Sequence, residues 1–122
     1  MGLFSFNKPA SKINWEPLTN SDQLTTIKAE SEEKPMIILK HSTRCSISLM
    51  AKSRLDNNWD VDEQDTKLYY LDLLRYRDLS NQIANDFKVL HESPQILIIK
   101  KGQCTYSATH SAIDARTVKQ NL

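Results

Sequence analysis

The chain has 122 residues, a length that suits one domain with a core of moderate size. Its 16 Lys and Arg residues against 15 Asp and Glu residues leave a net charge of +1, so no overall field draws it toward nucleic acid or an anionic membrane. The only glycines, Gly2 and Gly102, exclude the glycine-rich loops that cradle nucleotide phosphates. No apolar run approaches the roughly 20 residues of a membrane span.

Two cysteines, Cys45 and Cys104, occur in a chain long enough to fold without disulfides. The N-terminal segment lacks the basic and apolar regions of a signal peptide. Both observations favour a reducing compartment. We therefore expect a soluble cytoplasmic protein with two free thiols.

The first third of the chain predicts a leader, a helix and a central strand. Residues 1–12 show no sustained periodicity and are expected to be a flexible leader, with the domain spanning 13–122. Residues 13–15 suit a short strand, and a helix is expected over 21–33 behind an N-capping segment. The run 36–40 is apolar and rich in β-branched residues, which is typical of a strand covered on both faces in a parallel sheet.

A second helix and strand follow. Apolar residues recur at helical spacing after the central strand: Ile47, Met50, Ala51 and Leu55. Residues 67–73 predict the next strand, and Asp78 is expected to be the N-cap of a helix that follows it. Parallel strands joined by helices cross over right-handedly, so this order predicts an α/β sheet.

The C-terminal third predicts a hairpin and a last helix. A Ser93-Pro94 peptide, a candidate for the cis form, stands directly before the strand 95–100. A turn at 101–102 leads into the antiparallel strand 104–108, and a helix near 111–120 closes the domain.

Cys45 lies where the central strand gives way to a helix. A thiol attacks as its thiolate, and the unpaired amides and dipole of a helix N-terminus favour that anion. Ser48, one turn along the same face, is expected to donate its hydroxyl, and Arg44 adds a positive charge. These features predict a reactive nucleophile, although a small buried core cysteine fits the local sequence equally well.

The order of elements, with Cys-x-x-Ser after the first strong strand and X-Pro before the hairpin, resembles the thioredoxin fold, a four-stranded mixed sheet flanked by helices. A sharper resemblance, over about residues 36–114, is to the bacillithiol-system YtxJ family, the monothiol bacilliredoxins. The blocks that carry it are His41-Ser42-Thr43, Ile47-Ser48, Arg77-Asp78-Leu79-Ser80-Asn81-Gln82-Ile83-Ala84 and His91-Glu92-Ser93-Pro94-Gln95.

The resemblance implies a monothiol thiol-disulfide oxidoreductase that uses Cys45 and Ser48 to remove a bacillithiol-like small thiol from S-thiolated client proteins. It implies substrate contacts from Arg44, Ser46, Ser93 and Pro94, and a small thiol as co-substrate rather than a bound cofactor. The chain departs from the family pattern, similar to T-C-P-I-S, by carrying Ser46 where that pattern has proline. Serine restores an N–H that proline lacks and removes its fixed φ.

Two alternatives are weighed against this interpretation. The chain is either the enzyme or a non-catalytic thioredoxin-fold binding or stress protein whose Cys45 is only modified during oxidation, since fold does not imply function. The histidines His41, His91 and His110 show no ligand spacing with the cysteines, so no metal site is expected. We interpret His41 and His110 as solvated or hydrogen-bonded structural residues, with a position facing the cleft as the alternative.

Overall fold

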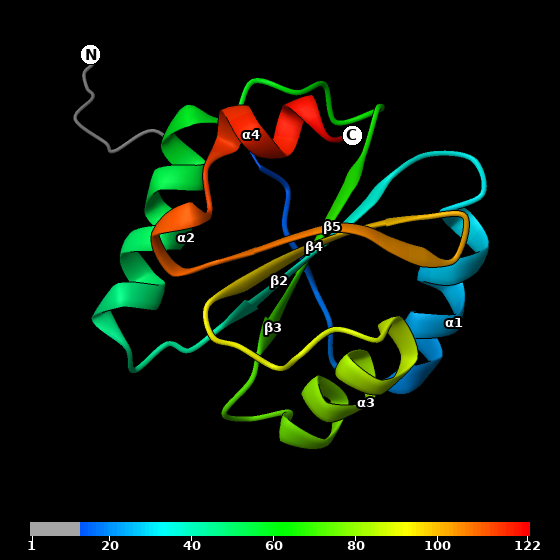
Figure 1. The fold of residues 1–122 in the computed structure, drawn as a ribbon, viewed down its shortest axis with the longest axis horizontal. Coiled ribbons are helices and arrows are strands. Elements are labelled where there is room, and N and C mark those ends of the chain that lie inside the picture. The colour runs from blue at the N-terminus through cyan, green and yellow to red at the C-terminus, as the bar shows by residue number, and fades with distance from the viewer. Residues whose placement is uncertain (1–12) are drawn as a thin grey trace, which may run out of the picture.

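The computed structural model describes residues 13–122 (Figure 1) and contains one mixed sheet of order β1-β3-β2-β4-β5. The predicted leader, residues 1–12, lies outside the described residues. The strands are β1 (Glu16–Pro17), β2 (Met36–His41), β3 (Lys67–Asp72), β4 (Gln95–Lys100) and β5 (Gln103–Thr109). The helices are α1 (Ser21–Glu30), α2 (Ser46–Asn58), α3 (Arg77–Phe87) and α4 (Ala115–Gln120), with a 3-10 turn at His110–Ala112.

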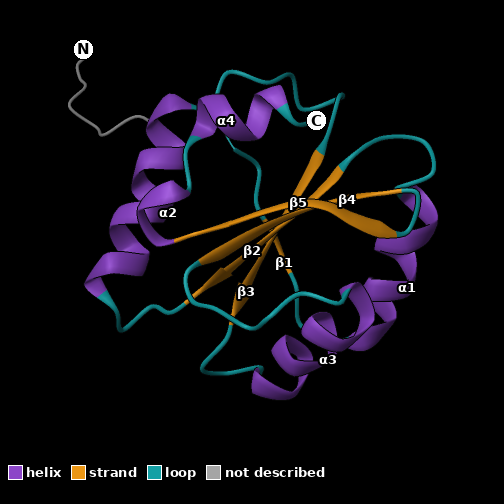
Figure 2. Cartoon of the chain, viewed as in Figure 1, coloured by secondary structure: helices purple, strands orange, loops and turns teal. Residues whose placement is uncertain are grey.

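Helices cover both faces of the sheet (Figure 2). β2 runs parallel to β3 and antiparallel to β4, and β1 adds a parallel pair at the far edge of β3. Helices α2 and α4 pack on one face, which we call the α2 face, and α1 and α3 pack on the other, the α3 face. The α/β mixed sheet is as predicted, with β1 as a fifth strand. No helix within residues 13–122 is long and apolar enough to cross a membrane.

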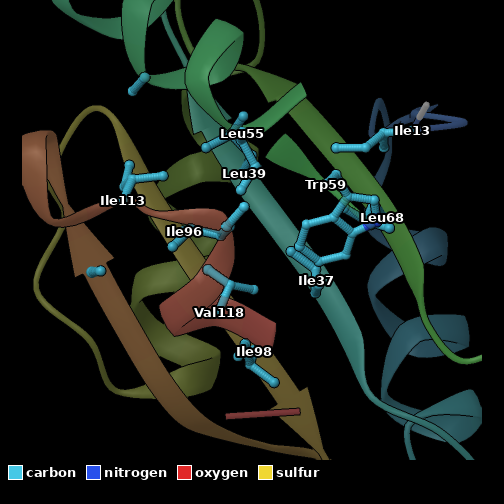
Figure 3. Close-up of a cluster of buried hydrophobic side chains, with 13 residues drawn as sticks. Ile13, Ile37, Leu39, Leu55, Trp59, Leu68, Ile96, Ile98, Ile113 and Val118 are labelled. Carbon is cyan, nitrogen blue, oxygen red and sulfur yellow. The ribbon is translucent and has the colours of Figure 1, made fainter. Parts of the chain in front are cut away.

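Every residue of β2 is buried, so the strand sends alternate side chains into two separate cores. Ile37 and Leu39 join the core on the α2 face, where Figure 3 shows them converging with Leu55, Trp59 and Val118. Met36 and Ile38 join the core on the α3 face. The apolar run therefore forms the central strand, as expected of a segment covered on both sides.

Three N-terminal and middle boundaries differ from expectation. The first strand forms at Glu16–Pro17 rather than at 13–15, because Ile13 is buried in the core of the α2 face. Helix α1 ends at Glu30 because Ser31 is tied to the hairpin turn, accepting a bond from the amide of Gly102 at 2.8 Å. Helix α3 begins at Arg77 with Tyr76 at the N-cap, so Asp78 lies in the first turn instead of capping it.

The last predicted helix is divided. Residues His110–Ala112 form the 3-10 turn, and α4 begins only at Ala115. Asp114 caps α4 by accepting a hydrogen bond from the amide of Thr117 at 3.0 Å. Ile113 is fully buried between the two segments, and this apolar anchor separates the turn from the helix. The capping signal of Asp114 thus prevails over a continuous helix.

Lys40 is the residue of β2 that carries an ammonium group into the interior, and its exposed fraction is 0%. Its Nζ donates to the carbonyl of Ser80 at 3.1 Å and lies 3.4 Å from Nδ1 of His91. None of the ion pairs found in residues 13–122 includes Lys40. Burial lowers the pKa of Lys40 from 10.5 to about 8. The fold therefore holds a charged amine that the interior disfavours.

Replacing Lys40 by methionine should stabilise the fold. The pKa shift corresponds to roughly 3 kcal/mol of disfavoured charge at pH 7, and an apolar side chain of similar length avoids it. We expect Lys40→Met to raise the free energy of unfolding by about 1–3 kcal/mol at pH 7. Urea unfolding of the two proteins, with Lys100→Met at the partly exposed end of β4 as control, measures the difference.

The stability difference between wild type and Lys40→Met depends on pH. Between the folded pKa of about 8 and the unfolded value of 10.5, the unfolded chain holds the proton more tightly, so wild-type stability rises with pH in that window. Lys40→Met lacks this rise. A methionine variant less stable than wild type at pH 7 would show instead that the hydrogen bonds of the ammonium outweigh its burial.

Candidate active site

Cys45 occupies the N-cap position of α2, after a short loop from the end of β2. Its backbone is extended, with φ −111° and ψ 121°, and no side chain caps the helix. The first bond at this end is from the amide of Leu49 to the carbonyl of Cys45, at 3.0 Å. The amides of Ser46, Ile47 and Ser48 precede that bond and have no acceptor within the helix. A negative charge on the half-buried Cys45 sulfur would lie at these donors.

A buried brace holds the loop that carries Cys45. Ser48 is fully buried, and its Oγ accepts a hydrogen bond from the amide of Ser42 at 2.9 Å. The same oxygen lies 2.9 Å from Nδ1 of His41, the last residue of β2. The amide of Cys45 in turn donates to the carbonyl of Ser42 at 3.2 Å. The strand end, the loop and the first turn of α2 are thereby joined into one rigid unit.

This brace changes how Ser48 relates to Cys45. The sequence predicts that the Ser48 hydroxyl donates to the Cys45 sulfur. In the structure, Ser48 bonds instead to His41 and Ser42, and within residues 13–122 it makes no hydrogen bond to Cys45. A serine has one proton and two lone pairs. Only when Nδ1 of His41 carries a proton and donates it is the Ser48 proton free to turn toward the sulfur. The direct role of Ser48 at the thiolate stays a prediction.

The protonation of His41 depends on charges from two elements. Burial is the main cause that lowers its pKa below 6.5, and Lys52 on α2 lowers it further. Asp72 on β3 and Asp56 on α2 oppose this shift, as does the bond to Ser48. The imidazole is therefore neutral near pH 7, and its bond to Ser48 fits a structural, hydrogen-bonded histidine.

The loop before β4 completes the site. Its Ser93-Pro94 peptide is cis, as the sequence suggested. The antiparallel register pairs Lys40 with Gln95, so Pro94 lies beside the strand end that leads to Cys45. The carbonyl of Pro94 accepts a bond from the amide of His110 at 3.1 Å, and Ser93 is half-buried. Two segments separated by half the chain thus meet at one end of the sheet.

Exposed residues neighbour Cys45 in the chain and on α2. Arg44 and Ser46, on either side of Cys45, are both exposed, as contact residues for a substrate must be. On the outer side of α2, Ile47 and Met50 are 55% and 62% exposed. Apolar groups this exposed near Cys45 suit contact with another protein.

Cys104 lies at the other end of the sheet. It pairs with Ile99 on β4, which pairs with Met36 at the start of β2. The five steps from Met36 to His41 carry β2 roughly 17 Å toward the active end, which exceeds the reach of about 7 Å for a disulfide. Burial raises the pKa of the Cys104 thiol, whose sulfur contacts the carbonyl oxygen of Tyr106 at 3.3 Å. Both cysteines are free.

The structure also brings together polar groups that sequence reasoning missed. The α3 face buries three polar residues, Lys40, Ser80 and Gln95. The exposed residue His91 contacts Lys40 and Ser80 from the solvent side. The signal in the sequence was a lysine inside an otherwise apolar strand, which is rare unless the amine has partners. Among residues 13–122, no group of three or more His, Cys, Asp or Glu side chains is arranged to hold a metal ion.

Comparison with solved structures identifies the fold. A thioredoxin-fold protein provisionally described as an oxidoreductase shares 32% sequence identity with a TM-score of 0.75, covering 88% of this chain and 92% of its own. The thioredoxin of Malassezia sympodialis matches with 15% identity and a TM-score of 0.68, over 95% and 94% of the two chains. Thioredoxin NaTrxh of Nicotiana alata has 14% identity and a TM-score of 0.67, over 93% and 94%.

The α/β sheet, the cysteine at the start of α2 and the cis proline before β4 therefore make up a thioredoxin-like fold. The family described as "Monothiol bacilliredoxin BrxC" matches residues 16–118, which include every strand, Cys45 and Pro94. Family and fold together assign a thiol oxidoreductase. The chain belongs to the monothiol bacilliredoxin family.

Proposed function

We propose that this protein removes a bacillithiol-like small thiol from S-thiolated proteins in a reducing cytoplasm. The observation that carries the proposal is the placement of Cys45, half-buried at the N-cap of a 13-residue helix that has no side-chain cap, at the end of the sheet where the register brings Pro94 alongside β2. The family membership supports a thiol partner of the bacillithiol type. The site needs no bound cofactor, because the small thiol is a co-substrate.

In the proposed first step, the Cys45 thiolate attacks the small-thiol sulfur of the mixed disulfide. A bond forms between Cys45 Sγ and that sulfur, the original disulfide bond breaks, and the client protein leaves as its thiolate, which takes a proton from water. The disulfide passes from the client to Cys45, so the client cysteine returns to its thiol form and Cys45 carries the mixed disulfide. The first-turn amides of α2 stabilise the negative charge on the Cys45 sulfur before the attack. The backbone of Ser93 pairs with the bound substrate.

Reset requires a second thiol because Cys104 is out of reach. The thiolate of a second small-thiol molecule attacks the small-thiol sulfur bound to Cys45, so a small-thiol disulfide forms and Cys45 leaves as its thiolate. For each client reduced, one free small thiol is oxidised, and the small-thiol disulfide that forms contains this thiol and the one removed from the client. Arg44 and Ser46 stand on either side of Cys45 in the chain, and we propose that they contact the incoming thiol.

The first test compares two cysteine variants on a peptide whose cysteine carries bacillithiol as a mixed disulfide. Cys45→Ser should release no peptide thiol, whereas Cys104→Ser should act at close to the wild-type rate, because burial and strand register keep Cys104 from the site. Mass spectrometry of the wild-type reaction should show bacillithiol on Cys45 as the intermediate.

Turnover separates this proposal from a non-catalytic protein. With free bacillithiol as the reductant, the enzyme releases many equivalents of peptide thiol. One equivalent captured on Cys45 with no reset would establish the binding or stress protein instead. A Cys45-Cys104 disulfide in the oxidised monomer would refute the one-cysteine mechanism.

The second test removes the Ser48 hydroxyl. Ser48→Ala leaves the Ser42 amide and the His41 ring without their shared partner, at an expected cost of about 1–3 kcal/mol in unfolding free energy. The loop should loosen and the rate of Cys45 alkylation by iodoacetamide at pH 7 should fall. Ser53→Ala, at an exposed position of α2, is the control for helix propensity. Stability and alkylation rate both equal to that control would contradict the brace.

A further inference from the structure

A buried polar cluster lies on the α3 face, directly behind the end of the sheet that holds the active site. Lys40 on β2 and Gln95 on β4 are neighbours in the antiparallel register, and the carbonyl of Ser80 on α3 accepts a hydrogen bond from Lys40. Their exposed fractions are 0%, 3% and 1%. The Oε1 atom of Gln95 is buried with no hydrogen-bond partner within the described chain. Such a cluster lowers the stability of a core compared with apolar residues, so its presence points to a role other than stability.

The cluster holds the loop that leads into Pro94. Nδ1 of His91 lies 3.4 Å from Nζ of Lys40 and 3.2 Å from Oγ of Ser80. Nε2 of Gln95 donates to the carbonyl of Leu90 at 2.9 Å. Two consecutive loop residues are therefore bound to the sheet, although Leu90 is 85% exposed and His91 is exposed. The peptide of Ser93 and Pro94 follows two residues later.

We propose that Lys40 and His91 are positioning residues that hold the 88–94 loop so that the backbone of Ser93 is presented to the mixed disulfide beside Cys45. The inference rests on the proposed function, because it assigns these residues to the docking of the same substrate. Lys40 acts through the loop and does not contact the sulfur. Its side chain leaves β2 on the α3 face, whereas His41, the next residue, braces α2 on the other face.

The contact between the two residues requires a neutral His91 and a charged Lys40. Nδ1 of His91 can accept from the ammonium only while it is unprotonated. Burial, Lys40 and Arg77 on α3 lower the pKa of His91, and Glu92 in the loop opposes them. In acid, protonation of His91 places two cations together and releases the loop. Above the Lys40 pKa of about 8, the ammonium becomes a weaker neutral donor.

The pH dependence of substrate docking therefore has two limbs. With the full chain and the bacillithiolated peptide, the wild-type KM should be lowest near pH 7, rising in acid below 6.5 and in base above about 8. Lys40→Met should raise the KM at pH 7 about fivefold, as expected for one lost hydrogen bond, with kcat close to wild type. Lys100→Met is the matched control and should leave both values unchanged.

Substitution of His91 separates positioning from a general loss of structure. His91→Ala should raise the KM like Lys40→Met. His91→Asn places an amide oxygen near the position of Nδ1, and this acceptor does not titrate, so the low KM at pH 7 should return with the acid limb abolished. A merely structural histidine would show parallel losses of stability in both variants and the wild-type pH profile in whatever activity remains. That result would overturn the proposal.

A measurement without substrate distinguishes failure of this inference from failure of the proposed function. Amide hydrogen exchange of residues 89–93 should accelerate in Lys40→Met while the rate of Cys45 alkylation stays at the wild-type value. If wild type releases no peptide thiol yet exchange accelerates in Lys40→Met, the proposed function fails and the loop anchor stands. If wild type turns over but Lys40→Met has wild-type exchange and KM, the anchor is wrong and the function stands.

Discussion

The burial of β2 on both faces is the constraint on which the site depends. A strand in this position sends consecutive side chains to opposite sides, so its last two residues serve different halves of the site. His41 turns toward α2 and fastens the loop that carries Cys45. Lys40 turns toward α3 and reaches the loop that carries Pro94. One strand end thus contacts both the loop that carries Pro94 and the segment that carries Cys45.

The burial of the Lys40 amine and the His41 imidazole at the end of β2 lowers the stability of the fold. A core of apolar side chains in their place would bury no charge and leave no unpaired oxygen such as Oε1 of Gln95. Positions where a protein departs from the most stable arrangement are often those that position a functional group. The helix N-terminus at Cys45 follows the same pattern, because its first-turn amides are left without a side-chain cap.

Much of the architecture was predictable because local pattern and tertiary environment agree. The strand at 36–40, the strand at 95–100 and the cis Ser-Pro peptide each have few alternatives, and all three occur as expected. The errors fall where a distant contact decides a boundary. Helix α1 stops where Ser31 meets the hairpin turn, and the first strand forms beyond Ile13 because that residue enters the core. Such contacts join residues far apart in sequence and leave no local signal.

The sequence by itself determined the fold class, the family and the position of Cys45 at a strand-to-helix junction, because apolar periodicity, turn residues and motif spacing are local properties. Only the tertiary structure decided what Ser48 and Lys40 contact. Ser48 is one helical turn from Cys45, yet its oxygen is taken by His41 and Ser42. Lys40 lies 51 residues from His91 along the chain. Which neighbour a buried polar atom finds depends on how strands and helices pack, and spacing alone does not encode it.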